Sequence, residues 1–588
     1  MHQKFESISS KGNHFRSKQT LTRLLSVILQ FKEVSAIGLF MILLSTLAAL
    51  LEPRVMGWII DDALLPKDWN KLHQMGVCYV IVLVVRVLSL MIQSYCFELL
   101  GQRVTQDLRE KLFGHIQRLS MRDLGHYSSG KLLTRVMNDT SSLQEMFSGG
   151  FLLILTHSLL VLGTLIWLFV LSPKLALLAV SILPALFFLS AIFSRSLKKA
   201  YHHTREHLSV LNSFLAENIS GMKVVQLFSR QKKQLERFYQ LNERYAEVQT
   251  SSVRVFAYFQ PSITLATGFA ISMVIGVGGR HVIEGILPIG ILVTFFSYLL
   301  GLFQPIRELA DRWNVFLSGL TAADRIFDLL DTPTERECDE AQDSMNQLQP
   351  VRGHIVFEDV SFSYDDKNWI LQNFSLEILP GQRVGIVGHT GAGKSTLIQL
   401  LLRFYDPQKG RILLDGVDIR TLKKKDLRAS LGFVQQDVFL FSGTLGENLT
   451  LGSETKLERL HQWCEALELG LELTKKVEER GVNLSAGEKQ KIALVQVMLR
   501  EPKIWILDEA TAHLDAESER VFHQALEWSA KNCTQIMIAH RLETVRWADR
   551  IIVLNQGRIV ELGTHSELMH QNGLYSKLIQ LQYVSYSH

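Results

Sequence analysis

The sequence predicts two unlike halves: an α-helical membrane domain of six spans with long helical extensions, followed by an α/β domain. Long apolar runs are confined to the part of the 588-residue chain before about residue 305. From Val351 onward the chain is rich in short strands, and a glycine-rich loop there joins an apolar strand to an apolar helix. Length alone allows three or four domains, but this uneven distribution favours two.

The first half contains apolar runs that are each long enough to cross a hydrocarbon core, which takes about 20 helical residues. A buried helix of a soluble protein can imitate one such run, but a series of them with few charges argues against a soluble domain. The six expected spans lie near 34–60, 74–97, 149–171, 174–194, 255–279 and 286–305, within a membrane domain of residues 34–330.

Lysine and arginine are concentrated before the first span, between the second and third, and between the fourth and fifth. The remaining connectors hold one or two each, so the positive-inside rule predicts that the basic segments are cytoplasmic. We therefore expect a multi-pass protein of the inner or plasma membrane with both termini, residues 1–33 and the α/β domain in the cytoplasm. The first twenty residues lack an apolar core, so we expect no cleaved signal peptide.

The cytoplasmic connectors 98–148 and 195–254 have helix-forming sequences with few prolines. We expect them to extend the spans as rigid helices on which the α/β domain can push. Short breaks are expected at Tyr127–Gly130 and Asn218–Gly221. They are either contact points for that domain or ordinary turns between helices.

Two features within the spans have open interpretations. Arg86 lies in the second span, where a charge is costly, so it either faces a cavity or pairs with an acid such as Glu52. Aromatic residues of the last span either line an apolar cavity or serve packing and lipid contact: Phe295, Phe296, Tyr298 and Phe303.

Residues 331–350 are polar and lack periodicity, which predicts a linker before an α/β domain of residues 351–588. In that domain the strand Arg383–Val387 leads through a glycine-rich loop into the helix Thr396–Leu402. This is the context of a phosphate-binding loop, in which backbone N–H groups surround the β-phosphate, Lys394 reaches the β- and γ-phosphates and Ser395 holds Mg²⁺. The expected nucleotide-binding residues here are Gly388, His389, Thr390, Gly391, Ala392, Gly393, Lys394, Ser395 and Thr396.

A second phosphate-handling element is expected where the apolar strand Ile504–Leu507 ends in Asp508 and Glu509. An acid at the end of such a strand organises the Mg²⁺ water shell, and the next carboxylate orients or deprotonates an attacking water. These two elements together predict a bound nucleotide and Mg²⁺ as the metal.

Further motifs follow in order: Tyr364 in Phe-Ser-Tyr, Phe433–Asp437, Leu484–Glu488, Leu514–Asp515 and Ala539–Arg541. With the two elements above, they resemble the ATP-binding cassette family, specifically exporter-type half-transporters such as the lipid A flippase and bacterial multidrug exporters. The membrane half agrees, since Gly130–Arg135 with Asn138–Thr140, and Gly221–Phe228, resemble the family's first and second intracellular loops. In relatives these loops dock on the nucleotide-binding domain. The resemblance covers nearly the whole chain.

The resemblance implies a role for each matching residue. Glu509 would be the catalytic base, Gln436 would contact Mg²⁺ or the lytic water, and His540 would hold the γ-phosphate. Asp508 would support the metal together with Ser395 and Gln436. Tyr364 would stack on adenine, Asp515 belongs to the D-loop, and Ser485 and Gly487 would reach the γ-phosphate of ATP held by a partner chain. Because the chain has one copy of each motif, it should dimerise.

The signature departs from the family pattern, with Ala486 at its third position and Glu488 at its fifth. Glu488 either folds back on the helix start as a capping box or places a negative charge where a γ-phosphate must dock. The altered signature with an intact Glu509 leads to the hypothesis of a heterodimer with a second half-transporter, in which one ATP site turns over. Glutamate-ending signatures also occur in symmetric members, so a homodimer stays open.

The predicted function is ATP-driven transport through the lipid bilayer, most simply export of a small hydrophobic or amphipathic substrate, lipid or drug-like. The alternatives are an importer of siderophore-like substrates on the exporter fold, a soluble or regulatory ATPase, and an ATP-gated channel or receptor. The six spans argue against the second alternative, and Glu509 with His540 argues against the third. A net charge of +4 is accounted for by the cytoplasmic connectors, so no nucleic-acid partner is expected.

Overall fold

The structure is a computed structural model that describes residues 19–181, 183–335, 351–365, 367–452, 457–470, 472–508, 519–520, 524, 527, 533–538 and 545–586. Its contacts divide the chain into two compact units. The helical unit comprises the residues up to His115 together with Ser129–Thr332, and the α/β unit comprises Ile116–Ser128 together with Pro333–His588. A short piece of the first cytoplasmic connector therefore belongs to the second unit.

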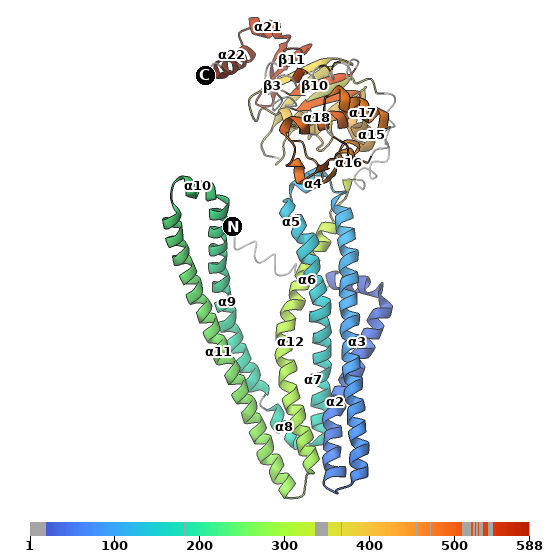
Figure 1. Ribbon diagram of the computed structural model, residues 1–588, viewed down its shortest axis with the longest axis vertical. Helices are drawn as coiled ribbons and strands as arrows, with labels where there is room; N and C mark the ends of the chain where they lie inside the picture. The colour runs from blue at the N-terminus through green and yellow to red at the C-terminus, as the bar shows by residue number, and fades with distance from the viewer. Residues whose placement is uncertain are drawn as a thin grey trace. The chain divides into compact units, whose positions relative to one another are not determined.

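Long helices make up the helical unit, and α11 lies beside α9 while α12 lies beside α2 and α7 (Figure 1). The long helices are α2 (Lys32–Trp58), α3 (Trp69–Ile116), α7 (Leu152–Leu171), α9 (Leu183–Ser220), α11 (Gln231–Ile283) and α12 (Ile289–Leu330). The shorter segments are η1 (Ile59–Leu64), α5 (Ser129–Thr134), η2 (Arg135–Asp139), α6 (Thr140–Glu145), η3 (Met146–Phe151), α8 (Pro173–Val180) and α10 (Met222–Leu227). Pro173 opens α8 at the position where its missing N–H costs nothing.

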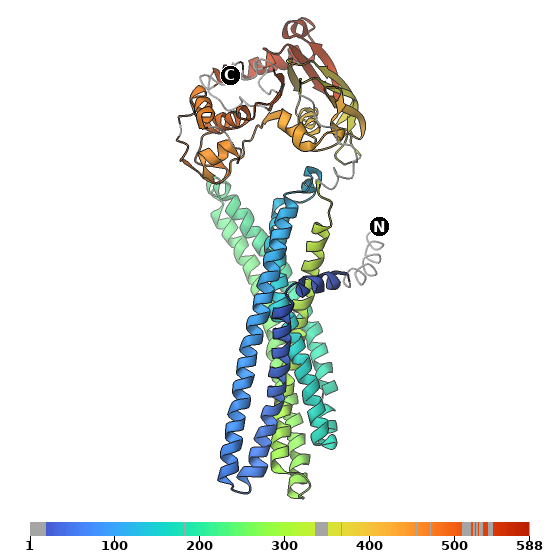
Figure 2. The ribbon, with the colours of Figure 1, turned by 90° about the vertical axis from the view of Figure 1, so that its right-hand side faces the viewer.

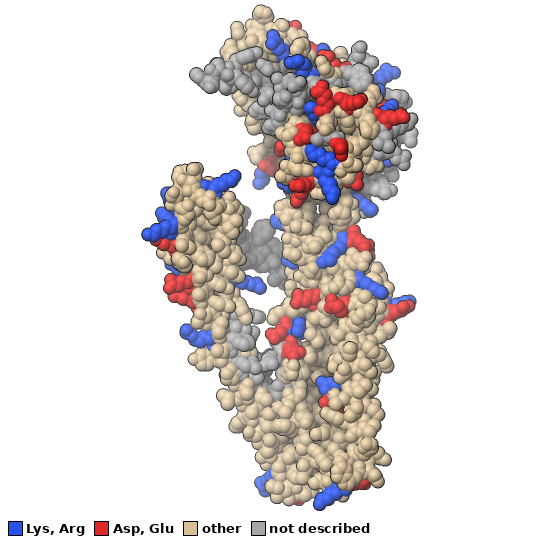
Figure 3. Space-filling model, viewed as in Figure 1, with Lys and Arg blue, Asp and Glu red and all other residues tan. Residues whose placement is uncertain are grey.

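Within the described residues, four helical stretches are long and apolar enough to cross a membrane: Lys32–Leu64, Trp69–Ile116, Ser129–Leu171 and Ile289–Leu330. Few charges lie over the lower halves of the helices on the face shown in Figure 3. Each expected span overlaps a helix, although 286–305 begins before α12 and 174–194 extends over both α8 and α9. The fourth and fifth expected spans, 174–194 and 255–279, lack so long an apolar window in the described residues. The apolar part of α11 is the shorter Thr267–Ile283.

The helices continue well past the expected spans, as predicted for the connectors. Helix α3 runs to Ile116 and α11 begins at Gln231, so each presents a long helical extension. The expected breaks also appear, because α9 ends at Ser220 and a separate short helix, α10, follows Gly221.

The core of the helical unit decides between the alternatives for Phe295, Tyr298 and Arg86. Phe296 is half-buried, and the side chain of Phe303 lies outside the described residues. Phe295 and Tyr298 are buried among leucines of α7 and α12, and the Tyr298 hydroxyl donates to the Leu50 carbonyl. Both therefore serve packing. Arg86 forms an ion pair with Glu52 on α2, which supports the pairing interpretation for this charge.

The α/β unit contains two main sheets in its described residues (Figure 2). One has the order β2-β1-β4-β5 and the other β12-β11-β3-β10-β9-β6, with β11, β3, β10, β9 and β6 parallel. The strands are β1 (Ile355–Phe362), β2 (Leu371–Ile378), β3 (Arg383–Gly388), β4 (Lys409–Leu414), β5 (Val417–Asp418), β6 (Leu431–Val434), β7 (Gly443–Thr444), β8 (Lys476–Val477), β9 (Ile504–Asp508), β10 (Thr534–Ile538), β11 (Arg550–Asn555) and β12 (Arg558–Gly563).

Helices surround these sheets and carry the loops that form the site. They are α4 (Met121–Gly125), α14 (Lys394–Leu401), η4 (Ile419–Thr421), α15 (Lys424–Ser430), α16 (Leu445–Thr450), α17 (Leu457–Ala466), η5 (Glu479–Gly481), α18 (Ala486–Met498), α21 (His565–His570) and α22 (Leu574–Tyr586). The strands β3, β9 and β10 are nearly continuous runs of buried apolar residues, as expected for parallel strands covered on both faces. This packing fixes the edge of the sheet from which the site loops emerge.

Candidate active site

The glycine-rich loop connects the end of β3 at Gly388 to the start of α14 at Lys394. Gly391 and Gly393 have φ angles of +82° and +103°, a region that side chains other than glycine rarely adopt. Gly393 is the residue that caps α14, and the Ala392 N–H donates to the His389 carbonyl at 3.1 Å. The loop therefore turns tightly and leaves the first N–H groups of α14 at its mouth, which is the geometry that favours an anion.

We predict that Gly393→Ala weakens nucleotide binding. Besides the left-handed φ, a Cβ at this position would lie 2.9 Å from Leu371 Cδ2, so the loop would have to shift. Strain of this kind costs about 1–3 kcal/mol, and the expected result is a weaker affinity for ATP in equilibrium titration. Gly381→Ala is the control, because Gly381 has a φ of +75° in the turn before β3 and a Cβ there meets no neighbour. Equal affinity loss in both variants would contradict the prediction.

Lys394 is buried, and its ammonium donates to the carbonyls of Gly388 at 2.6 Å and His389 at 3.1 Å. Ser395 is exposed in the first turn of the same helix, whereas Thr396 and Ala392 are buried beneath the loop. A desolvated cation at a helix N-terminus fits a polyphosphate, and an exposed hydroxyl next to it fits Mg²⁺.

The register of the large sheet brings distant residues to the same edge as this loop. Ile538 at the end of β10 pairs with Ile386 on one side and with Asp508 on the other. Val434 at the end of β6 pairs with Leu507, so Gln436 follows at that edge. Asp508 is half-buried and Gln436 is exposed. Ligands of open parallel sheets bind outside the carboxyl ends of the strands, which is where these side chains and the loop lie.

Tyr364 lies beside α14 although 30 residues separate it from Lys394 in the chain. Its hydroxyl donates to Gln399 Oε1 at 2.7 Å and lies 3.2 Å from Thr396 Oγ1. The ring remains 46% exposed, which leaves an aromatic surface close to the phosphate loop. Glu509, Asp515 and His540 lie outside the described residues.

Comparison with known proteins gives matches over most of the chain. The family description "ABC transporter transmembrane region" matches residues 35–306, and "ABC transporter" matches residues 371–512. An uncharacterised ABC transporter ATP-binding protein of Bacillus subtilis (strain 168), YknV, is 36% identical over 572 residues, which is 95% of this chain and 94% of the relative. The chain is an ATP-binding cassette transporter of the exporter type.

Two further relatives illustrate the range of this family. An ATP-dependent lipid A-core flippase of Nitrosococcus oceani is 33% identical and covers 91% of this chain and 90% of the relative. Among solved structures, a bacterial Atm1-family ABC exporter with ATP bound has a TM-score of 0.75 at 26% identity, covering 94% of this chain and 98% of that one. As an ATP-binding cassette transporter, the chain couples ATP hydrolysis to transport.

The segment Leu484–Glu488, which resembles the signature, forms the capping box that its sequence allowed. The Ser485 N–H donates to Glu488 Oε2 at 2.7 Å, and the Glu488 N–H donates to Ser485 Oγ at 3.2 Å. Lys475 Nζ lies 3.8 Å from Glu488. Burial raises the pKa of Glu488, but these hydrogen bonds and the nearby Lys475 and Lys491 outweigh that effect and lower it below its usual value. Glu488 is therefore charged at neutral pH, and a lysine partly balances its charge. Gly487 is half-buried one residue before it.

One group of charged residues in the ATP-binding cassette transporter gave no signal in the sequence. We call this group the Glu335 cluster, and it consists of Glu335, Lys424 and Arg428. Glu335 lies at the start of the segment expected as a linker, and it pairs with the two cations on helix α15. Of the range 331–350, the structure describes 331–335. An isolated acid in a polar, aperiodic segment is indistinguishable from its solvated neighbours until its partners are known.

Proposed function

We propose that this transporter exports a hydrophobic or amphipathic molecule, works as a dimer, and hydrolyses ATP at the edge formed by the phosphate loop, Asp508 and Gln436. The pairing of Ile538 with both Ile386 and Asp508 is the observation that carries the proposal, since it brings the phosphate loop and the acid to one edge. Two such groups at one edge of the sheet, following strands β3 and β9 with β10 between them, match the requirements of phosphoryl transfer to water.

The proposal assigns a role to each of these side chains. Lys394 binds the β- and γ-phosphates, His540 holds the γ-phosphate, and Gln436 orients the attacking water. Glu509 accepts the proton of that water as its oxygen bonds to the γ-phosphorus and the bond to ADP breaks, giving ADP and phosphate. Ser395, Gln436 and Asp508 would hold Mg²⁺, which when bound neutralises charge on the phosphates. Tyr364 stacks on adenine, and Asp515 contributes from the D-loop.

The substrate class rests on the apolar helices and on the names of relatives. One is a lipid A-core flippase, and another, 34% identical over 501 residues, is a probable multidrug resistance protein of Bacillus subtilis. Both names point to molecules that partition into a bilayer. We further propose six membrane crossings, with both termini and the α/β unit in the cytoplasm, because the basic connectors would then obey the positive-inside rule.

Dimerisation follows in this proposal from the single copy of each motif, with Ser485 and Gly487 completing the ATP site of a partner chain. The paired Glu488 supports an asymmetric dimer, because a signature that carries a negative charge near a γ-phosphate attracts it less than a neutral one. The site completed by this signature would then mainly hold nucleotide, while the site that uses Glu509 turns over.

This arrangement predicts that a second half-transporter co-purifies with the chain from its native membranes in mild detergent. Vanadate trapping of labelled ADP should then retain one nucleotide for every two nucleotide-binding domains, because only one site completes the reaction. The chain purified alone should hydrolyse ATP slowly. A dimer of two identical chains that traps two nucleotides would contradict the asymmetry and leave hydrolysis itself intact.

A further inference from the structure

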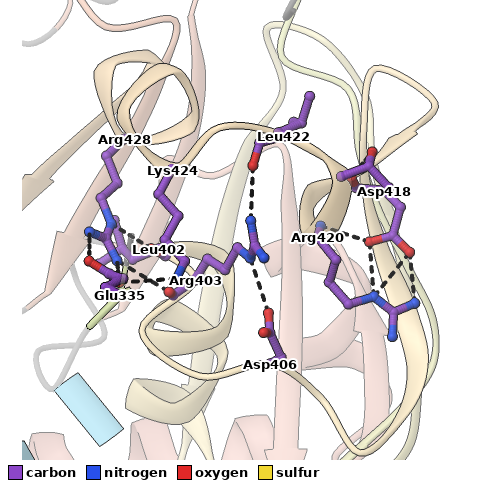
Figure 4. Close-up of polar contacts among 10 residues, drawn as sticks. Glu335, Leu402, Arg403, Asp406, Asp418, Arg420, Leu422, Lys424 and Arg428 are labelled. Carbon is purple, nitrogen blue, oxygen red and sulfur yellow. Dashed lines mark hydrogen bonds and ion pairs between the residues drawn. The ribbon is translucent and has the colours of Figure 1, made fainter. Parts of the chain in front are cut away.

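The Glu335 carboxylate lies between two cations of helix α15 (Figure 4). Arg428 Nη2 donates to Glu335 Oε1 at 2.9 Å and Arg428 Nη1 to Oε2 at 3.2 Å, which is a bidentate pair, and Lys424 Nζ lies 3.3 Å from Oε1. The three side chains are 14–31% exposed. Burial raises the pKa of Glu335, but Arg428 and Lys424 outweigh this effect and lower it, so the carboxylate is charged at neutral pH.

The backbone of Glu335 holds a second segment that comes from the first cytoplasmic connector. Its N–H donates to the Arg118 carbonyl at 2.8 Å, and the preceding Thr334 pairs with Leu119 as an isolated antiparallel bridge. Both segments belong to the α/β unit, and each directly follows a long helix of the other unit in the chain, α12 or α3. Glu335 thus links the two segments, near Arg118 and Glu335, in which the chain passes from the helical unit into the α/β unit.

The segment held by Glu335 also approaches the aromatic residues beside the phosphate loop. After Leu119 it continues into α4, where a Cβ on Gly125 would lie 3.6 Å from the Tyr405 hydroxyl. The ring of Tyr405 lies edge-on to that of Tyr364, with 5.1 Å between their centroids.

Arg428 connects the same carboxylate to the helix of the phosphate loop. Its Nε donates to the Leu402 carbonyl and its Nη2 to the Arg403 carbonyl, both at 3.2 Å, just beyond the end of α14 (Figure 4). Helix α15, which carries Arg428, continues directly into β6, and β6 leads to Gln436. Arg428 is therefore connected to the end of the phosphate-loop helix by hydrogen bonds and to Gln436 through α15 and β6.

We propose that Glu335 is a positioning residue that transmits changes at the phosphate loop to the helices α3 and α12. The inference rests on the proposed function, because it assigns the coupling between ATP hydrolysis and membrane rearrangement to one ion-pair cluster. Glu335 does not touch the reacting atoms, so its loss should uncouple the two processes and leave the chemical step in place.

The test uses the full chain, with any partner it requires, in lipid nanodiscs. Trp69 and Ile283, which are 80% and 89% exposed, are replaced by spin-labelled cysteines in a background without the native cysteines. Pulsed electron resonance then measures the distance between the labels without nucleotide and with ATP and vanadate. The same preparations give the rate of ATP hydrolysis.

In the otherwise unaltered protein, ATP with vanadate should shift the distance distribution. In Glu335→Gln the hydrolysis rate should stay within about twofold, while the ratio of shifted to unshifted molecules should fall about five- to tenfold. Arg428→Gln should reduce both quantities, because it also loses the contacts beyond α14. Asp418→Asn is the matched control, since Asp418 pairs with Arg420 at 2.7 Å on the same unit without touching the connectors, and it should change neither quantity.

A full distance shift in Glu335→Gln would overturn the proposal, and so would a parallel loss of hydrolysis and shift, which would mark a merely structural contact. Hydrolysis without any shift in the unaltered protein would also overturn it, because there would be no rearrangement to transmit. Failure of the unaltered protein to hydrolyse ATP would instead overturn the proposed function on which the inference rests.

Discussion

Glu509→Gln is expected to reduce the rate of ATP hydrolysis by about 10²- to 10⁴-fold, the usual contribution of a positioned general base. Glutamine has the shape of glutamate but cannot accept the proton of the attacking water. ATP binding should persist, because Lys394 and the N–H groups of α14 are unchanged. Phosphate release measures the rate, and a nucleotide-binding assay verifies that the site remains filled.

Glu501→Gln is the matched control for this variant. Glu501 is an acid near the opposite end of the same strand, β9, where it forms an exposed pair with Arg459 at 2.7 Å. Removing that surface pair should leave hydrolysis unchanged, because exposed pairs contribute little. If Glu509→Gln hydrolyses ATP at the original rate, Glu509 is not the base.

Lys394→Met is expected to weaken ATP binding about 10- to 100-fold and to reduce hydrolysis with it, because a charge-assisted hydrogen bond contributes about 1.5–3 kcal/mol. The ammonium already lies at the loop mouth on the carbonyls of Gly388 and His389, so little reorganisation separates it from a phosphate. Titration with a fluorescent ATP analogue measures the affinity, and a thermal melt verifies that the unit is folded.

Lys577→Met provides the comparison, because Lys577 is an exposed lysine on α22 and carries the same charge. Its loss should leave the affinity unchanged. An equal decrease in both variants would show that net charge, and not the position of Lys394, governs the affinity. Unaltered affinity in Lys394→Met would contradict the role proposed for this residue.

Several parts of the molecule were predictable because the residues concerned are neighbours in the sequence. The strand, turn and helix around Lys394 form one contiguous stretch, so the glycine spacing and the apolar flanks were enough to predict its conformation. The same holds for the capping box of Ser485 and Glu488, which spans three residues. The apolar runs likewise predicted helices, since their backbone groups are satisfied within each segment.

Other parts depend on pairing between distant segments. The order β3-β10-β9-β6 brings Asp508 and Gln436 to the same edge of the sheet as the phosphate loop, although the two residues are 72 positions apart. Tyr364 likewise approaches Thr396 and Gln399 only because the small sheet packs near α14. Neither arrangement leaves a periodic or local pattern in the chain.

The sequence by itself determined that this protein has membrane-crossing helices, a phosphate loop and a capped signature helix, because each is stabilised by hydrogen bonds and apolar patterns within a few turns of chain. The tertiary structure decided that Phe295 and Tyr298 pack in a core, that Arg86 pairs with Glu52, and that Glu335 meets Arg428. The physical reason is the same in each case. The energy of such contacts depends on which distant groups share a desolvated space, and only the folded chain selects those neighbours.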